Sequence, residues 1–236
     1  LLADQSESLM AAGLSRVNVS LDTLAGDRFA WITGPNGEGG PDGPRRVLEG
    51  IERAASAGLA PVKINVVLIR GFNDDELGQF ADLTRDRDYE VRFIEFMPMG
   101  PRGFWGSDKV VTADEAMGKL EAILGPLEKL ARRSGSGPAV CYRAPGHRGT
   151  LGFITPVSSH FCADCNRIRI TSDGKLRACL FSDDETDILT PMREGKTDEE
   201  ILVMIRDTLA RKPEGHGMGR GGKVNGCART MSHIGG

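Results

Sequence analysis

The first half of the chain alternates strand-like and helix-like segments, and this alternation restricts the fold more than any other feature. Residues 16–21 alternate polar and apolar side chains, while residues 62–69 and 91–96 are rich in β-branched and aromatic side chains, so all three runs are typical of strands. Segments with helical periodicity separate them. Strand–helix–strand repeats form right-handed units with parallel strands. We therefore expect an α/β fold whose parallel sheet is either open or part of a barrel.

Three of the intervening segments begin with residues that favour a helix start. Asp42 precedes an amphipathic segment that ends at Gly58, and Asn73 precedes a second one. Thr112 and Glu115 have the spacing of a capping box at the start of a third. We expect a helix after each of these starts.

The pattern changes after Pro126, where short strands follow one another without intervening helices. Ser172-Asp173-Gly174 is a strong hairpin signal, and Thr197 with Glu200 predicts a final capped helix. We expect two regions, an α/β region over residues 1–126 and an antiparallel β region with a helix over residues 127–236. The candidate strands of the second region are residues 140–143, 150–154, 167–171 and 175–178.

Composition excludes some classes of function. The net charge of −3 argues against a general nucleic-acid binder, and the sequence contains no apolar run long enough to span a membrane. The chain opens on Leu1 with a segment typical of the middle of an amphipathic helix, so we expect it to be part of a longer protein. Its five cysteines are an odd number, which argues against a disulfide framework.

Three of these cysteines are the most informative residues in the chain. Cys162 and Cys165 form a Cys-x-x-Cys pair, and the predicted hairpin would bring Cys179 back beside them. The spacing alone leaves three alternatives: a zinc site completed by His160 or His147, an iron–sulfur cluster with one open iron, or unconnected buried cysteines.

Arg167 and Arg169 follow the Cys-x-x-Cys pair and are two residues apart, which places them on one face of a strand. Paired guanidinium groups bind phosphate oxygens well, although two arginines on an exposed strand are more commonly only solvated. The acidic run over residues 182–187 is expected to be a solvated loop.

The cysteine segment carries a resemblance to a known family. The string FCADCNRIRITSDGKLRACLF at residues 161–181, together with residues 16–24, 62–67, 92–97 and the terminal Ile234-Gly235-Gly236, closely resembles radical S-adenosylmethionine (SAM) enzymes of the GTP 3′,8-cyclase family. These motifs occur in the family's order and span nearly the whole chain. The Gly-rich residues 34–43 are the main departure.

The resemblance implies a fold and a reaction. The fold would be the C-terminal part of an incomplete (β/α)6 radical SAM barrel, contributing its last three strands, followed by a small antiparallel region that binds an auxiliary [4Fe–4S] cluster. The reaction would convert GTP to 3′,8-cyclo-GTP, the first step of molybdenum cofactor biosynthesis. It begins with a 5′-deoxyadenosyl radical from SAM, which a second [4Fe–4S] cluster generates. The Cys-x-x-x-Cys-x-x-Cys motif that holds that second cluster does not occur in these residues, so we expect this chain alone to be inactive.

The resemblance also implies roles for single residues. Matching positions assign Cys162, Cys165 and Cys179 to the auxiliary cluster, Ser20 and Met97 to SAM, and Lys63, Arg167 and Arg169 to GTP. Taken alone, Ser20 would be an ordinary strand-end hydroxyl and Met97 a core residue, whereas Lys63 within an apolar strand needs a polar cavity. Gly235 and Gly236 would help to position catalytic groups, although a Gly-Gly end is normally frayed.

Two further classes remain open, namely another radical SAM enzyme such as a peptide-modifying maturase and a non-catalytic zinc-stapled binding module. The implied partners are GTP, SAM and the downstream cyclic pyranopterin monophosphate synthase. A homodimer is compatible with the resemblance, and neither nucleic acid nor a membrane is expected as a partner. The expected compartment is the cytoplasm for a bacterial protein and the mitochondrial matrix for a eukaryotic one. Cys141 and Cys227 are interpreted as incidental thiols.

Overall fold

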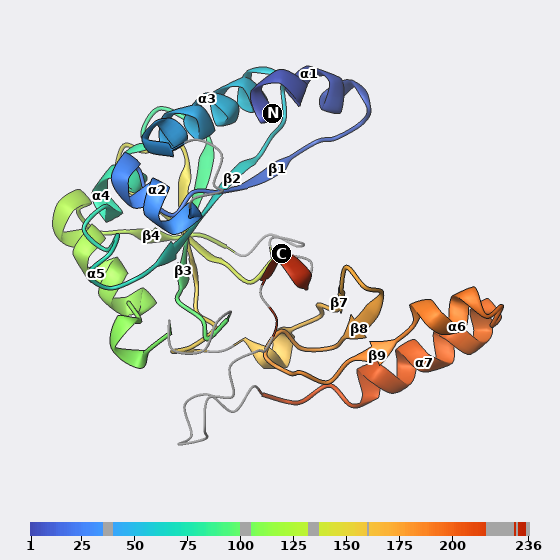
Figure 1. The fold of residues 1–236 in the computed structure, drawn as a ribbon. Helices are drawn as coiled ribbons and strands as arrows, with labels where there is room; N and C mark the ends of the chain where they lie inside the picture. The colour runs from blue at the N-terminus through green and yellow to red at the C-terminus, as the bar shows by residue number, and fades with distance from the viewer. Residues whose placement is uncertain are drawn as a thin grey trace. The chain divides into compact units, whose positions relative to one another are not determined.

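The structure is a computed structural model, shown in Figure 1. It describes residues 1–34, 40–99, 105–131, 137–159, 161–215, 229 and 231–234. The chain divides into two compact units, each described here by itself. The first unit comprises Leu1–Phe96 and Asp108–Pro156, and the second comprises Met97–Ser107 and Val157–Gly236.

The first unit is built on a six-stranded sheet with the strand order β1-β2-β3-β6-β5-β4. Neighbouring strands are parallel from β1 to β6, and the last two pairs are antiparallel. In the described part of the chain the sheet is open, with β1 and β4 at its edges. The strands are β1 (Val17–Ser20), β2 (Val62–Leu68), β3 (Tyr89–Glu95), β4 (Glu128–Lys129), β5 (Val140–Arg143) and β6 (Thr150–Ile154).

Three of these strands differ from the expected organisation. The sequence predicts three parallel strands, but β6 is a fourth, because it pairs parallel to β3 through Val91–Leu151 and Phe93–Phe153. β5 and β4 then extend the same sheet. Residues 128–154, which the sequence analysis grouped with the C-terminal region, therefore belong to the first unit. Whether a domain boundary follows residue 126 stays a prediction.

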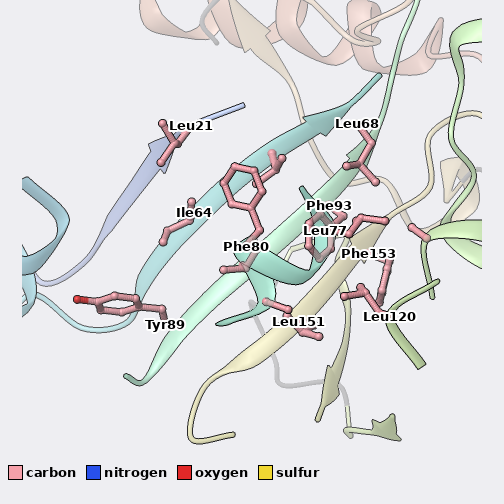
Figure 2. Close-up of a cluster of buried hydrophobic side chains, with 14 of the residues drawn as sticks. Leu21, Ile64, Leu68, Leu77, Phe80, Tyr89, Phe93, Leu120, Leu151 and Phe153 are labelled. Carbon is pink, nitrogen blue, oxygen red and sulfur yellow. The ribbon is translucent and has the colours of Figure 1, made fainter. Parts of the chain in front are cut away.

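Helices cover one face of this sheet (Figure 1). The strand β2 buries Val62, Ile64, Val66 and Leu68 on that face, which is the alternation expected of a strand with one apolar side. Figure 2 shows how Phe80 and Leu77 of α4 and Leu120 of α5 pack on Ile64, Phe93 and Phe153 of the strands. The helices of this unit are α1 (Leu2–Ala11), α2 (Gly26–Thr33), η1 (Gly40–Asp42), α3 (Gly43–Ser56), α4 (Leu77–Asp82) and α5 (Ala113–Leu124), and η2 (Ser107–Lys109) lies at the junction of the units.

The predicted helix starts have different outcomes. Thr112 caps α5, since its hydroxyl accepts a hydrogen bond from the Glu115 backbone N–H at 3.3 Å. Asp42 precedes α3 as expected but makes no side-chain capping bond. A helix follows Asn73 as expected, but Asn73 does not cap it, because α4 begins at Leu77 and the buried Asn73 side chain bonds to Ile69, Asp22 and Val67 instead.

The second unit contains a three-stranded antiparallel sheet, β7-β8-β9, followed by helices. The predicted hairpin at residues 172–174 is confirmed, because β7 and β8 pair across it and Gly174 has a positive φ of 78°. The predicted final helix is also confirmed, with a complete capping box between Thr197 and Glu200. The elements are η3 (Cys162–Asp164), β7 (Arg169–Ile170), β8 (Lys175–Arg177), β9 (Thr186–Asp187), α6 (Leu189–Arg193), α7 (Asp198–Ala210) and η4 (Met231–His233).

The observed fold is therefore a mixed α/β sheet accompanied by a separate small antiparallel sheet. Among the helices that the structure describes, none is long and apolar enough to cross a membrane.

Candidate active-site residues

The sheet of the first unit has a polar face opposite its core. The strand register sets Asn18 of β1, Lys63 of β2 and Glu90 of β3 in one row across the sheet. Two positions further along, a second row holds Ser20, Asn65 and Arg92. Side chains alternate between the two faces of a strand. The same alternation therefore places the apolar side chains of β2 in the core and Lys63 and Asn65 on the polar face.

Lys63 lies in a charged cluster on this face. Its Nζ is 3.9 Å from Glu90 Oε2, and Arg92 Nε donates a hydrogen bond to Glu90 Oε1 at 2.5 Å. All three side chains are largely shielded, with exposures of 13% for Lys63, 15% for Glu90 and 9% for Arg92. Burial, with help from the Arg92 charge, lowers the pKa of Lys63, although the Glu90 carboxylate opposes this change. Two cations therefore lie beside the Glu90 carboxylate.

Two neighbouring residues shape this cluster. Gly152 of β6 lies opposite Arg92, and a Cβ at Gly152 would come within 3.2 Å of Arg92 Cγ, so the missing side chain leaves room for the arginine. Cys141 Sγ lies 3.7 Å from Glu90 Oε1. Burial and the Glu90 charge raise the pKa of Cys141 to about 11, which keeps this thiol protonated at neutral pH.

The end of β1 is tied to the end of β2 by a buried polar network. Ser20, the last residue of β1, is exposed, and the following Leu21 N–H donates to the Asn65 carbonyl at 3.0 Å. Asp22 Oδ1 accepts from the Val67 backbone N–H at 2.8 Å, and burial raises the pKa of this carboxyl against the effect of that bond. Asn73 Nδ2 donates to the Asp22 carbonyl at 2.6 Å. The chain directly after Ser20 is therefore held in one conformation by hydrogen bonds.

Met97 comes two residues after β3 and is half-buried. Its carbonyl accepts a hydrogen bond from the Met99 N–H at 2.8 Å. Met97 thus follows the carboxyl end of a parallel strand, the edge at which ligands of open α/β sheets bind.

The cysteines of the second unit lie on neighbouring elements. Cys162 begins η3, and the Cys165 N–H donates to the Cys162 carbonyl at 3.1 Å, which forms a tight turn. Arg169 pairs with Arg177 across the hairpin, and the same antiparallel register extended by two residues would set Arg167 opposite Cys179. Cys162, Cys165 and Cys179 are all half-buried free thiols.

Cys165 has the environment of a thiolate. Burial acts to raise its pKa, but the Arg167 backbone N–H and the charges of Lys212 and Arg167 outweigh burial and lower it. Lys212, just beyond α7, places its Nζ 3.5 Å from Cys165 Sγ and donates to the carbonyls of Cys165 and Arg167 at 2.6 and 3.0 Å. A depressed thiol pKa is typical of cysteines that bind metals or react as nucleophiles.

Arg167 and Arg169 are close but do not share a strand as expected. The strand β7 begins only at Arg169, and the exposed Arg167 guanidinium lies 5.2 Å from the centre of the Phe161 ring. Burial and the Arg167 charge lower the pKa of Arg169, while negative charge on Cys165 and Cys179 would raise it. Arg169 therefore lies within electrostatic reach of two of the three cysteines.

Several predicted ligands cannot be placed in one site. His147 belongs to the first unit, where its Nδ1 lies 2.8 Å from Thr84 Oγ1. His160, Cys227, Gly235 and Gly236 lie outside the described residues. Within the described ranges, no three His, Cys, Asp or Glu side chains are grouped as ligands of a metal ion.

Sequence reasoning missed three residues of these clusters. Glu90 and Arg92 become neighbours of Lys63 only through the register of β2 and β3, and Lys212 reaches Cys165 from a position far along the chain. The alternation of Glu90 and Arg92 in a strand-like run was the one available signal for the first two.

Comparison with known families defines the class of protein. Residues 1–84 match the radical SAM superfamily, and residues 89–218 match the family described as Molybdenum Cofactor Synthesis C. The chain is thus a radical SAM protein, an enzyme class, and its function lies in molybdenum cofactor biosynthesis.

Comparison with individual proteins defines the family. The chain is 46% identical to a GTP 3′,8-cyclase of Pelotomaculum thermopropionicum over 236 residues, which cover 100% of this chain and 70% of that protein. It is 45% identical to a GTP 3′,8-cyclase of Moorella thermoacetica, covering 97% of this chain and 68% of the relative. A GTP 3′,8-cyclase of Alkaliphilus metalliredigens is 43% identical, with coverage of 100% and 69%. The chain belongs to the GTP 3′,8-cyclase family.

Proposed function

We propose that this chain supplies the GTP site and the auxiliary [4Fe–4S] cluster for the conversion of GTP to 3′,8-cyclo-GTP. The arrangement at the hairpin of the second unit carries the proposal. Cys162 and Cys165 form the turn at η3, Cys179 follows β8, and Arg169 lies within electrostatic reach of Cys165 and Cys179. Three cysteine ligands leave one iron of such a cluster open to a substrate atom.

The donor set fits this group chemically. Iron–sulfur clusters are held by thiolates, and the lowered pKa of Cys165 favours the thiolate form. Lys212 adds a positive charge beside Cys165 Sγ, which would offset the negative charge of a bound cluster. When bound, the cluster would supply a Lewis-acidic iron for the guanine base.

The arginines beside the cysteines would bind the substrate's phosphates. Arg167 and Arg169 bring two guanidinium groups next to the proposed cluster ligands. Lys63 and Arg92 place two positive charges on the polar face of the sheet. A triphosphate needs several cations to be bound inside a protein, so both groups of residues suit GTP.

Ser20 and Met97 are proposed to contact SAM, since Ser20 ends the parallel strand β1 and Met97 follows the carboxyl end of β3. The SAM-cleaving [4Fe–4S] cluster would be held by a Cys-x-x-x-Cys-x-x-Cys motif, which these residues do not contain. The product would be consumed by a cyclic pyranopterin monophosphate synthase. Gly235 and Gly236 are proposed to position groups at the reacting centre.

The cluster proposal is tested by single cysteine replacements in the enzyme that carries both clusters. Cys162→Ser, Cys165→Ser and Cys179→Ser should each lose about half of the iron, because one of two four-iron clusters is removed. SAM cleavage at the other cluster should persist. Iron and sulfide analysis with Mössbauer spectroscopy measures both clusters separately.

Cys141→Ser is the matched control, because burial and Glu90 keep the Cys141 thiol protonated and therefore a poor ligand. Its iron content should equal that of the unmodified enzyme. If Cys141→Ser removed as much iron as Cys165→Ser, or if stoichiometric zinc replaced iron, the ligand assignment would be wrong.

A further inference from the structure

One arginine, Arg229, binds the described residues near the C-terminus to the β7–β8 hairpin, which Cys179 follows in the sequence. Arg229 Nη1 and Nη2 donate to the two carboxylate oxygens of Asp173, each at 2.9 Å. The same guanidinium contacts Glu185, with Nη2 to Oε2 at 2.8 Å and Nε to Oε1 at 2.7 Å. One planar group thus makes four short contacts to two carboxylates, which a lysine ammonium cannot reproduce.

Both carboxylates belong to the small sheet and its connections. Asp173 lies in the turn between β7 and β8, where a Cβ on Gly174 would come within 2.4 Å of Leu189 Cβ, so this turn is closely packed. Glu185 comes directly before β9 and also binds Arg177 Nη1 at 3.1 Å. Arg177 is fully buried.

The acidic run at residues 182–187 is only partly the solvated loop that the sequence predicts, because Asp183, Asp184 and Asp187 are exposed whereas Glu185 is not. Glu185 is only 13% exposed and lies between two arginines. Asp183 also contacts Arg177 Nη2, at 3.3 Å. A buried arginine needs such carboxylates, because an unpaired buried charge is costly.

Two further contacts follow Arg229 along the chain. The Ser172 N–H donates to the His233 carbonyl at 3.3 Å, and the Ile234 N–H donates to the Met231 carbonyl at 3.1 Å. Ile234 is 0% exposed. Chain ends normally fray, whereas Arg229 and His233 contact the small sheet and its turn, and Ile234 is buried.

We propose that Arg229, Asp173 and Glu185 form a clamp, and that Arg229 is a positioning residue that holds the C-terminal segment on the hairpin carrying Cys179. Gly235 directly follows the buried Ile234, so the clamp would fix where the terminal glycine pair begins. The role in turnover rests on the function proposed above for Gly235 and Gly236. The clamp itself rests on the contacts of Arg229 alone.

The test uses Arg229→Gln and Arg229→Lys in the enzyme that carries both clusters. Hydrogen–deuterium exchange of the C-terminal peptide measures the clamp, and 3′,8-cyclo-GTP formation measures its effect on turnover. Loss of charge-assisted hydrogen bonds should speed exchange about 10- to 100-fold. Arg229→Lys keeps the charge but loses the bidentate geometry, so it should fall between the parent enzyme and Arg229→Gln.

Turnover should fall by a similar factor, with 5′-deoxyadenosine still formed but less of it coupled to product. Iron content and GTP affinity should stay within about twofold, because Arg229 contacts neither a proposed cluster ligand nor a proposed GTP residue. C-terminal exchange in the Arg229→Gln, Asp173→Asn double variant should be no faster than in Arg229→Gln, since the Asp173 carboxylate reaches the C-terminal segment through Arg229.

Arg211→Gln is the matched control. Arg211 is also bound to the small sheet, through Thr186 Oγ1 at 3.1 Å and Asp184 Oδ2 at 3.7 Å, but it is about half exposed. Its replacement should change neither exchange at the C-terminus nor turnover, because exposed pairs contribute little.

Three outcomes separate the clamp from the function on which it rests. Unchanged C-terminal exchange in Arg229→Gln would overturn the clamp, whatever the activity. Faster exchange in Arg229→Gln, together with full turnover after deletion of Gly235-Gly236, would uphold the clamp and refute the proposed role of the glycines. Slow turnover in the deletion variant with normal turnover in Arg229→Gln would refute the positioning role of Arg229.

Discussion

Asn73 gives the sharpest test of how the strand ends are held. Its side chain is fully buried, Oδ1 accepts from the Ile69 N–H at 2.8 Å, and Nδ2 donates to the carbonyls of Asp22 and Val67 at 2.6 and 2.8 Å. These three bonds join the segments that leave β1 and β2. Asn73→Ala removes all three and leaves their backbone partners without a side-chain partner.

The expected loss follows from the number of bonds. Each contributes about 1 kcal/mol net, so Asn73→Ala should lower the free energy of unfolding by about 3 kcal/mol. That corresponds to a roughly 150-fold larger unfolded fraction. For a chain of this length, the melting temperature should fall by about 6–12 °C.

Pulse proteolysis across a urea series measures this change at one temperature and tolerates a cofactor-bearing protein. Gln5→Ala is the control, since Gln5 is exposed on α1 and its replacement should stay within about 0.5 kcal/mol. A second readout is the KM for SAM, which should rise in Asn73→Ala, because Ser20 lies two residues before Asp22. A destabilisation below about 1 kcal/mol would show that the three bonds do not act as described.

Two further predictions concern substrate binding and pH. Arg169→Ala should weaken GTP binding by about 1.5–3 kcal/mol, the range for bonds to charged groups, and should weaken guanosine binding much less; equal losses in calorimetric titration would refute a phosphate contact. Burial lowers the pKa of His147, so the unfolded chain binds a proton that the folded chain does not. Stability from this residue is full above the unfolded pKa of about 6.5 and is lost as the pH falls below it. The urea midpoint should therefore fall more between pH 7.5 and 5.5 in the parent than in His147→Ala, and equal slopes would contradict this.

The sequence determined the features whose signals lie within a few residues of each other. Thr197 and Glu200 are three residues apart and form their capping box, and the Ser172-Asp173-Gly174 turn joins β7 to β8. The alternation along β2 likewise separated the apolar core face from the polar face that carries Lys63. Such features depend on local geometry, and the residues that form them are close in the sequence whatever the rest of the fold is.

Only the tertiary structure decided which distant residues meet. Asparagine is a common helix-capping residue, but the Asn73 side chain bonds to the Asp22 and Val67 carbonyls instead. These bonds hold it in the interior. Glu185 lies in an acidic run typical of a solvated loop, but Arg177 and Arg229 from other segments contact its carboxylate and shield it from solvent. Partners more than 40 residues apart, such as Arg229 and Glu185, are brought together by strand register and packing, because the free energy of such a pair depends on the burial that the whole fold creates.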